Sequence, residues 1–272
     1  MIPASFQYLR ASTVDEALTL LASHGDDVKV LAGGHSLLPL MKLRLAAPEY
    51  LVDIGPLDEL RYVRLEGDEV VIGALSRYSA LVRDPVLLEH APLLAHVSGE
   101  VGDRQVRHRG TIGGSLVHAD SAADLPAAVL ASDAVLVARG PSGERRIPAA
   151  EFFLGPFTTP LEPAELLTEI RLPAQTGQGW AFEKFTRRAI DWAMVGVTVV
   201  GGRVGLVNMG GVPLRATATE EALAAGASIE DAAALAAEGT NPPDEPHATA
   251  DYRRHLARVL TRRALTQAAA RS

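Results

Sequence analysis

Two glycine pairs, each followed by a small hydroxyl residue, are the part of this sequence best suited to chemistry. The first is Gly33-Gly34 in the run AGGHS, and the second is Gly113-Gly114 in the run TIGGS. Because glycine lacks a Cβ, an anion can approach its backbone closely, and consecutive N–H groups in such a turn can hold phosphate oxygens. Two such turns in one chain indicate a ligand with a long phosphate-bearing body, held from two sides.

Glycine pairs also form ordinary turns that bind nothing. Neither run matches the P-loop or the Gly-x-Gly-x-x-Gly pattern, so the ligand is not argued to be ATP or a Rossmann-bound dinucleotide. A third pair, Gly201-Gly202, separates two apolar stretches. We interpret it as a hairpin turn and not as a binding site.

Four long segments of the chain resemble one known family. They are VLAGGHSLLPLMKLRLAAPEYLVDI at 30–54, QVRHRGTIGGSLVHADSAADLP at 105–126, TTPLEPAELLTEIRLP at 158–173 and FEKFTRRAIDWAMVGV at 182–197. In this order and separation they resemble the FAD-binding medium subunit of molybdenum hydroxylases. That family includes aerobic carbon monoxide dehydrogenase and the flavin domain of xanthine dehydrogenase. The resemblance extends from Ile2 to about Gly211.

The resemblance implies an FAD site that uses both glycine segments and later parts of the chain. It implies that Asp124 accepts from ribityl or ribose hydroxyls, Leu161 contacts the flavin ring, Lys184 makes a polar contact and Trp192 approaches the isoalloxazine. The family usually has Asn where this chain has Ser115. The cofactor-binding residues implied are Ala32, Gly33, Gly34, His35, Ser36, Leu37, Thr111, Ile112, Gly113, Gly114, Ser115, Asp124, Leu161, Lys184 and Trp192.

Some of these residues also fit another interpretation. Ser36 can cap the next helix, and Asp124 can cap a helix that begins at Leu125. Trp192 can be a core residue. For His35 we favour a backbone N–H contact to pyrophosphate over an acid–base role.

Composition excludes several classes of protein. The chain has 272 residues, 47% hydrophobic, and a net charge of −7, which argues against nucleic-acid binding as its main role. It contains no cysteine, so it cannot hold a thiolate-ligated iron–sulfur cluster, a disulfide or a Cys nucleophile. The histidines show no metal-ligand spacing, and we expect no catalytic and no metal-binding residue on this chain. With no apolar run long enough to span a bilayer and no apolar leader core, a cytoplasmic location is expected.

The predicted fold class is α+β. We expect an FAD-binding domain over 1–175, of the PCMH or vanillyl-alcohol-oxidase-like type, with subdomains of about 1–55 and 56–175. A C-terminal domain over 176–272 should contain a three-stranded antiparallel sheet and helices. Ser12 and Asp15 stand at capping-box spacing before the first predicted helix. Because the glycine pairs fall in different subdomains, their ligand should lie in the crevice between them.

The resemblance implies an FAD-carrying, electron-transfer subunit of a heterotrimeric molybdenum hydroxylase, and hence an oxidoreductase. The [2Fe-2S] clusters would lie on a small subunit and the molybdenum cofactor on a large one, in a dimer of heterotrimers. Electrons would pass from the clusters to FAD and on to an external acceptor. The alternatives are a free-standing flavin oxidoreductase and a flavin-free nucleotide-binding scaffold. The substrate is left open, because its site would lie on another chain.

Overall fold

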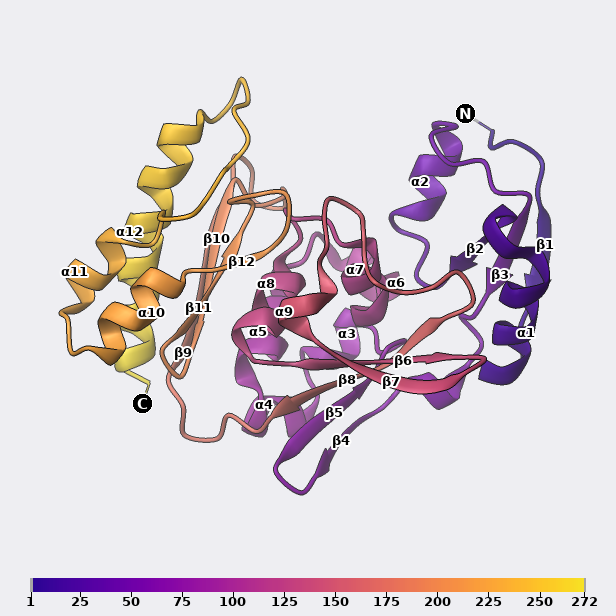
Figure 1. Cartoon of the computed structure of the whole chain (residues 1–272), viewed down its shortest axis with the longest axis horizontal. Coiled ribbons are helices and arrows are strands. Elements are labelled where there is room, and N and C mark those ends of the chain that lie inside the picture. Colours follow the sequence, from indigo (N-terminus) through magenta and orange to yellow (C-terminus); the bar gives the residue numbers. More distant parts are fainter. Residues whose placement is uncertain (1, 272) are drawn as a thin grey trace.

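The computed structural model describes residues 2–271, which form three groups of elements arranged side by side (Figure 1). The N-terminal group lies on the right, an antiparallel sheet with its helices lies in the middle, and the C-terminal group lies on the left. The mixture of a parallel sheet, antiparallel sheets and helices confirms the α+β class. No helix within this described range is long and apolar enough to cross a membrane.

The N-terminal group is a small parallel sheet with two helices. Its strands run in the order β1-β3-β2, with Gln7 opposite Tyr50 and Val28 opposite Tyr50 on the other side. Its elements are β1 (Gln7–Arg10), α1 (Val14–His24), β2 (Val28–Leu31), α2 (Leu37–Lys42) and β3 (Tyr50–Asp53). The first glycine pair therefore lies in the loop between β2 and α2.

The capping box of α1 lies one residue later than the sequence pattern suggested. The Thr13 hydroxyl accepts from the Glu16 N–H, and the Glu16 carboxylate accepts from the Ser12 N–H at 2.7 Å. The pairing of Ser12 with Asp15 was wrong because Thr13 takes the extended backbone of the N-cap.

The middle group is a five-stranded antiparallel sheet in the order β4-β5-β8-β6-β7, with helices inserted after β5. Its strands are β4 (Val63–Glu66), β5 (Glu69–Gly73), β6 (Val135–Gly140), β7 (Gly143–Pro148) and β8 (Leu166–Pro173). Its helices are α3 (Tyr78–Leu81), α4 (Pro85–His90), α5 (Pro92–Glu100), α6 (Arg104–Arg109), α7 (Ile112–His118), α8 (Asp124–Ala131) and α9 (Ala149–Phe152). The pairs β4–β5 and β6–β7 are hairpins with two-residue turns at 67–68 and 141–142.

The C-terminal group has four antiparallel strands where three were expected. The additional strand, β12 (Leu214–Arg215), has only two residues, too few to give an alternating pattern. The others are β9 (Trp180–Phe185), β10 (Val195–Val200) and β11 (Arg203–Val207), and the helices are α10 (Thr217–Ala224), α11 (Ile229–Ala234) and α12 (Ala250–Ala269). Gly201-Gly202 forms the hairpin turn between β10 and β11, with φ of +53° and +82°.

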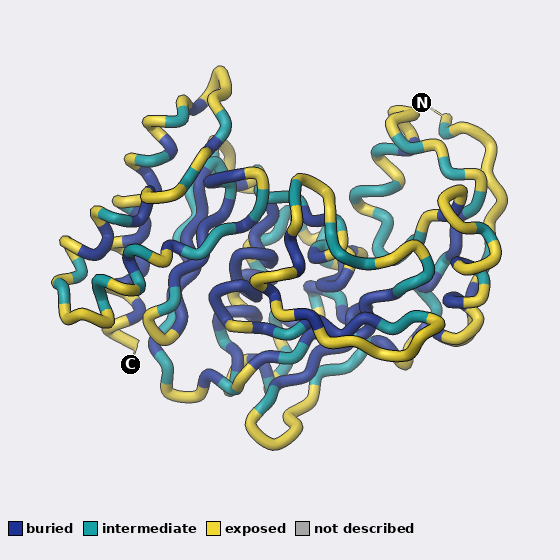
Figure 2. The backbone as a smooth tube through the Cα atoms, in the orientation of Figure 1, coloured by how far each residue is buried: buried dark blue, intermediate teal, exposed yellow. Residues whose placement is uncertain are grey.

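Helix α8 joins the middle and C-terminal groups. All eight of its residues are buried, and Figure 2 shows the surrounding backbone as buried as well. The Thr198 hydroxyl of β10 and the Arg203 guanidinium of β11 donate to carbonyls of Ala127 and Ala131 in this helix. A Cβ at Gly205 would lie 2.4 Å from the Ala127 oxygen, so the helix and the sheet can be this close only because residue 205 is glycine. This contact fixes how the C-terminal strands lie along α8.

Candidate functional site

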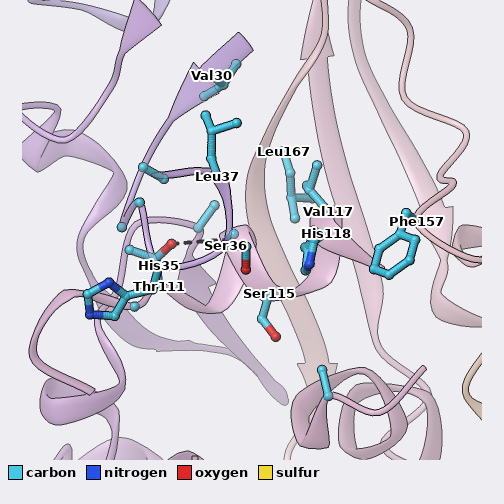
Figure 3. A pocket seen from close by; sticks show the side chains of 18 of the residues that line it. Val30, His35, Ser36, Leu37, Thr111, Ser115, Val117, His118, Phe157 and Leu167 are labelled. Carbon is cyan, nitrogen blue, oxygen red and sulfur yellow. Dashed lines mark hydrogen bonds between the residues drawn. The ribbon is translucent and has the colours of Figure 1, made fainter. Parts of the chain in front are cut away.

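A cavity of about 850 Å³ runs between the three groups of elements. It is lined by the β2–α2 loop, by α7, by the start of α8, by residues 157–167 and by residues 184–192. Figure 3 shows Ser36 and Ser115 from the two glycine segments along it, together with His118 and Phe157. The tertiary structure thus brings the two segments together, as expected from their sequence.

The first glycine segment offers a run of unpaired backbone donors. Within residues 2–271, the N–H groups from Gly33 to Leu37 have no hydrogen-bond partner, whereas the next one, of Leu38, donates to the Gly34 carbonyl. Gly34 has a φ of +77°, which turns the backbone so that successive N–H groups point the same way. A Cβ at Gly33 would lie 2.5 Å from the Arg109 carbonyl oxygen. Residues 33–37 therefore form a cradle of unpaired N–H groups, and this cradle packs closely against the middle group.

The second glycine segment is part of a helix and not a turn. The expectation of two similar glycine turns was therefore wrong for this segment. Gly113 and Gly114 lie in the first turn of α7, capped by the Thr111 hydroxyl. The Ile112 and Gly113 N–H groups donate to the carbonyls of Ser76 and Ala74, so neither is free for a phosphate. Gly113 is needed because a Cβ there would lie 2.7 Å from the Ala74 oxygen. This segment offers the hydroxyl groups of Thr111 and Ser115 to the cavity and packs closely against Ala74. It does not offer a row of unpaired backbone N–H groups.

Asp124 and Lys184 form a buried ion pair where α8 meets β9. The Lys184 Nζ lies 2.7 Å from Asp124 Oδ2 and also donates to the Glu100 carbonyl at 3.1 Å. The other carboxylate oxygen, Oδ1, is buried without a hydrogen-bond partner. Burial raises the pKa of Asp124 to about 6, although the Lys184 charge acts in the opposite direction. The N-cap alternative for Asp124 was wrong, since Ala123 holds the cap position and no side chain caps α8.

Exposed apolar side chains surround the end of the cavity that is lined by residues 157–167 and 184–192. Trp192 is 58% exposed and Ile190 is 64% exposed, and both line the cavity together with Phe157. The core interpretation of Trp192 was therefore wrong. Leu161 also lines the cavity and packs against the central core from one side. An exposed aromatic and its apolar neighbours could cover one face of a planar ring.

His35, Ser36 and Ile112 were also predicted to bind the cofactor. The His35 ring lies 3.2 Å from the Gln105 carbonyl and links the cradle to α6. Ser36 makes no side-chain cap to α2, so its hydroxyl is not used there. Ile112 is fully buried in the core and does not line the cavity, because an apolar side chain at the first position of α7 points inward. The other predicted residues line the cavity; their contacts with FAD stay predictions.

The sequence pattern missed the residues that complete the cavity at both ends. Tyr78 lines it from α3, and burial raises the pKa of Tyr78 to about 12, partly offset by a hydrogen bond with the Ser115 side chain. Val28, Val30 and Leu40 form an apolar end in the N-terminal group. A strand leading directly into a glycine loop was the available signal for Val30; no pattern marks Tyr78.

Comparison with known proteins finds two family models that match successive parts of the chain. Residues 4–175 match the family model described as the FAD binding domain in molybdopterin dehydrogenase, and residues 180–268 match the CO dehydrogenase flavoprotein C-terminal domain. The chain is 42% identical to the carbon monoxide dehydrogenase medium chain of Hydrogenophaga pseudoflava, over all of this chain and 99% of that one. It is 36% identical to the glyceraldehyde dehydrogenase medium chain of Sulfolobus acidocaldarius, over 99% of this chain and 100% of that one.

A solved structure agrees with these matches. A chain of the carbon monoxide dehydrogenase from H. pseudoflava that lacks the Mo-pyranopterin moiety superposes with a TM-score of 0.96, at 44% identity, over 100% of this chain and 99% of that one. The fold and the cavity therefore define a flavoprotein subunit of an oxidoreductase. The chain belongs to the family of FAD-binding medium subunits of molybdenum-containing hydroxylases that includes the carbon monoxide dehydrogenase medium chains.

Proposed function

We propose that this chain binds one FAD in the 850 Å³ cavity and holds it by the residues assembled there. The observation that carries the proposal is the row of unpaired N–H groups from Gly33 to Leu37, which can donate to the oxygens of a pyrophosphate. The partnerless Oδ1 of Asp124 is a second fit, because a hydroxyl of the ribityl or ribose group can donate to it. The missing Cβ at Gly33 lets this loop pack against the Arg109 carbonyl, and this packing fixes the position of the N–H groups.

The proposed orientation follows from the two ends of the cavity. The apolar end at Val28, Val30 and Leu40 suits the adenine, and the end with Lys184 and Trp192 suits the flavin ring. When bound, FAD supplies the redox chemistry, and the chain binds and orients it. No side chain of this site is proposed as an acid, a base or a nucleophile.

The test of this proposal is a titration of the purified chain with FAD. We expect one FAD per chain, visible flavin absorbance, and quenching of tryptophan fluorescence on binding that is reduced in Trp192→Leu. A chain that stays colourless after incubation with FAD would support the flavin-free scaffold instead. Turnover of an organic substrate by the isolated chain would support the free-standing flavin oxidoreductase.

We further propose the place of the chain in a complex. In this proposal it takes electrons from the [2Fe-2S] clusters of a small subunit and passes them to an external acceptor, while a large subunit carries the molybdenum cofactor. A cysteine-free chain cannot carry such clusters itself. The working units are the FAD-binding domain 1–175, with subdomains of about 1–55 and 56–175, and the C-terminal domain 176–272, in a cytoplasmic dimer of heterotrimers.

The assembly is tested by co-expressing the chain with its cognate small and large subunits. Size-exclusion chromatography should give one peak that contains all three chains and FAD, at a mass consistent with two of each. The isolated chain should show no turnover with the substrate of the complex. If the chain elutes alone while the other two associate, the partner proposal fails and the FAD proposal stands.

A further inference from the structure

A second cavity, of about 440 Å³, lies directly behind the FAD-binding cavity. The two cavities share Ala32, Leu75 and Thr111 as a common wall. The second cavity is formed by the N-terminal group on one side and the middle group on the other. Nothing in the function proposed above uses it.

The second cavity is lined by four arginines, Arg10, Arg61, Arg77 and Arg109. Within residues 2–271, the guanidinium groups of Arg10, Arg77 and Arg109 have no hydrogen-bond or ion-pair partner. Arg77 is partly buried and Arg10 and Arg109 are exposed. In a chain with a net charge of −7, such a gathering of unpaired cations is unexpected.

The acidic groups of the same cavity are already engaged. Asp53 accepts from the Tyr8 hydroxyl at 2.5 Å and from the Gly55 N–H at 2.8 Å. Asp58 pairs with Arg61, whose guanidinium also donates to the Gly55 carbonyl and keeps a buried, partnerless Nε. The cavity therefore holds four guanidinium cations against two carboxylates, and neither carboxylate forms an ion pair with Arg10, Arg77 or Arg109.

The charges of this cavity act on one another. Burial, and then the neighbouring charges of Arg61 and Arg109, lower the pKa of Arg77, while Asp58 acts in the opposite direction. Like charges that line one cavity repel one another, and an anion bound between them removes this repulsion. Arginine is the residue that binds phosphate oxygens in a bidentate way.

We infer that this arginine cavity is a binding site for a tetrahedral oxyanion, a phosphate or sulfate group. The anion would join Arg10 of the N-terminal group to Arg77 and Arg109 of the middle group. Arg77 pairs with Thr111 through a backbone bridge, and the Arg109 carbonyl faces Gly33. Occupation of the site would therefore hold the two sides of the FAD cavity together from behind.

The experiment is a calorimetric titration of the full chain, saturated with FAD, with inorganic phosphate at low ionic strength. We expect one phosphate per chain with a Kd below about 1 mM. Sulfate should compete and chloride should not. Arg77→Gln should weaken phosphate binding by at least about tenfold, whereas Arg146→Gln, an exposed arginine on β7 outside both cavities, should leave it unchanged.

Thermal unfolding gives a second readout that does not depend on FAD. Phosphate should raise the melting temperature of the wild type and of Arg146→Gln. Arg77→Gln should show a clearly smaller increase, because only the N–H groups of Gly33–Leu37 then remain to bind phosphate in the FAD-free chain. Without phosphate it should melt no lower than the wild type, because a repulsive charge is gone. These shifts are measurable on the FAD-free chain, so they separate this inference from the function proposed above.

Three results would overturn the inference. The first is phosphate binding of equal strength in Arg77→Gln and Arg146→Gln. The second is displacement of the bound phosphate by FAD, which would assign it to the cradle at Gly33–Leu37. The third is no phosphate binding together with loss of the small subunit from the Arg77→Gln complex, which would make the cavity a docking site for acidic side chains of that subunit.

Discussion

Gly33→Ala is expected to purify with little or no FAD. The added Cβ would lie 2.5 Å from the Arg109 carbonyl oxygen, and this neighbour is backbone that cannot rotate away. The loop must shift, and the row of free N–H groups that follows it shifts as well. We expect FAD binding to weaken roughly 5- to 150-fold, the range given by ~1–3 kcal/mol of overpacking. Fluorescence titration of the FAD-free chain measures this directly.

The matched control is Gly99→Ala. Gly99 lies in α5, and a Cβ there meets only a Val82 methyl group at 3.7 Å. Its FAD affinity should equal that of the wild type. Gly114→Val should also weaken FAD binding, because a Cβ there would lie 2.8 Å from the Thr111 hydroxyl oxygen that caps α7. Full FAD occupancy in Gly33→Ala would contradict the proposal that the N–H groups of Gly33–Leu37 hold FAD.

Lys184→Ala is expected to lower both the FAD affinity and the stability of the fold. The change removes a charge-assisted hydrogen bond, worth ~1.5–3 kcal/mol, and leaves the buried Asp124 carboxylate beside the Glu100 charge. Removing one partner of a buried pair costs about 3–5 kcal/mol in other proteins, less here if Asp124 takes up a proton. FAD affinity and melting temperature should both fall, while Lys42→Ala, an exposed lysine outside the cavity, should change neither.

The pH dependence gives this prediction its second readout. The folded-state pKa of Asp124, about 6, lies above its ordinary value of 3.8, so its contribution to the free energy of unfolding is complete below about pH 3.8 and is lost as the pH rises through about 6. If FAD donates a hydroxyl to the carboxylate, FAD affinity should change in the opposite direction and rise through about pH 6. In Lys184→Ala that rise should begin at higher pH, and in Asp124→Asn it should vanish. A pH-independent affinity in the wild type would remove Asp124 from the FAD contacts.

Much of the fold followed from local patterns in the sequence. The strands of the hairpins and of the small parallel sheet were predictable because alternation, turn residues and caps act over a few residues. The absence of cysteine determined that no thiolate-bound cluster lies on this chain. Such local patterns place a helix cap only to within about one residue, because the cap of α1 is Thr13 and not the expected Ser12.

The resemblance, and not periodicity, brought Asp124, Leu161, Lys184 and Trp192 together as site residues. Their spacing in the sequence carries no such signal, because they come from a helix, a strand and two loops that meet only after α8 packs on the C-terminal sheet. The same packing buries Asp124 against Lys184 and raises the pKa of Asp124.

The two glycine pairs show most clearly what the sequence determined and what the tertiary structure decided. In both pairs the first glycine lets the backbone pack closely against a neighbouring segment. The sequence was sufficient to identify both pairs. Only the structure shows that Gly33-Gly34 keeps its N–H groups free while the Gly113 N–H is taken by the Ala74 carbonyl. A backbone donor is free or paired according to which strand or loop lies beside it, and that neighbour is distant in sequence. The difference between a cradle for a phosphate and the first turn of a helix was therefore decided by tertiary packing.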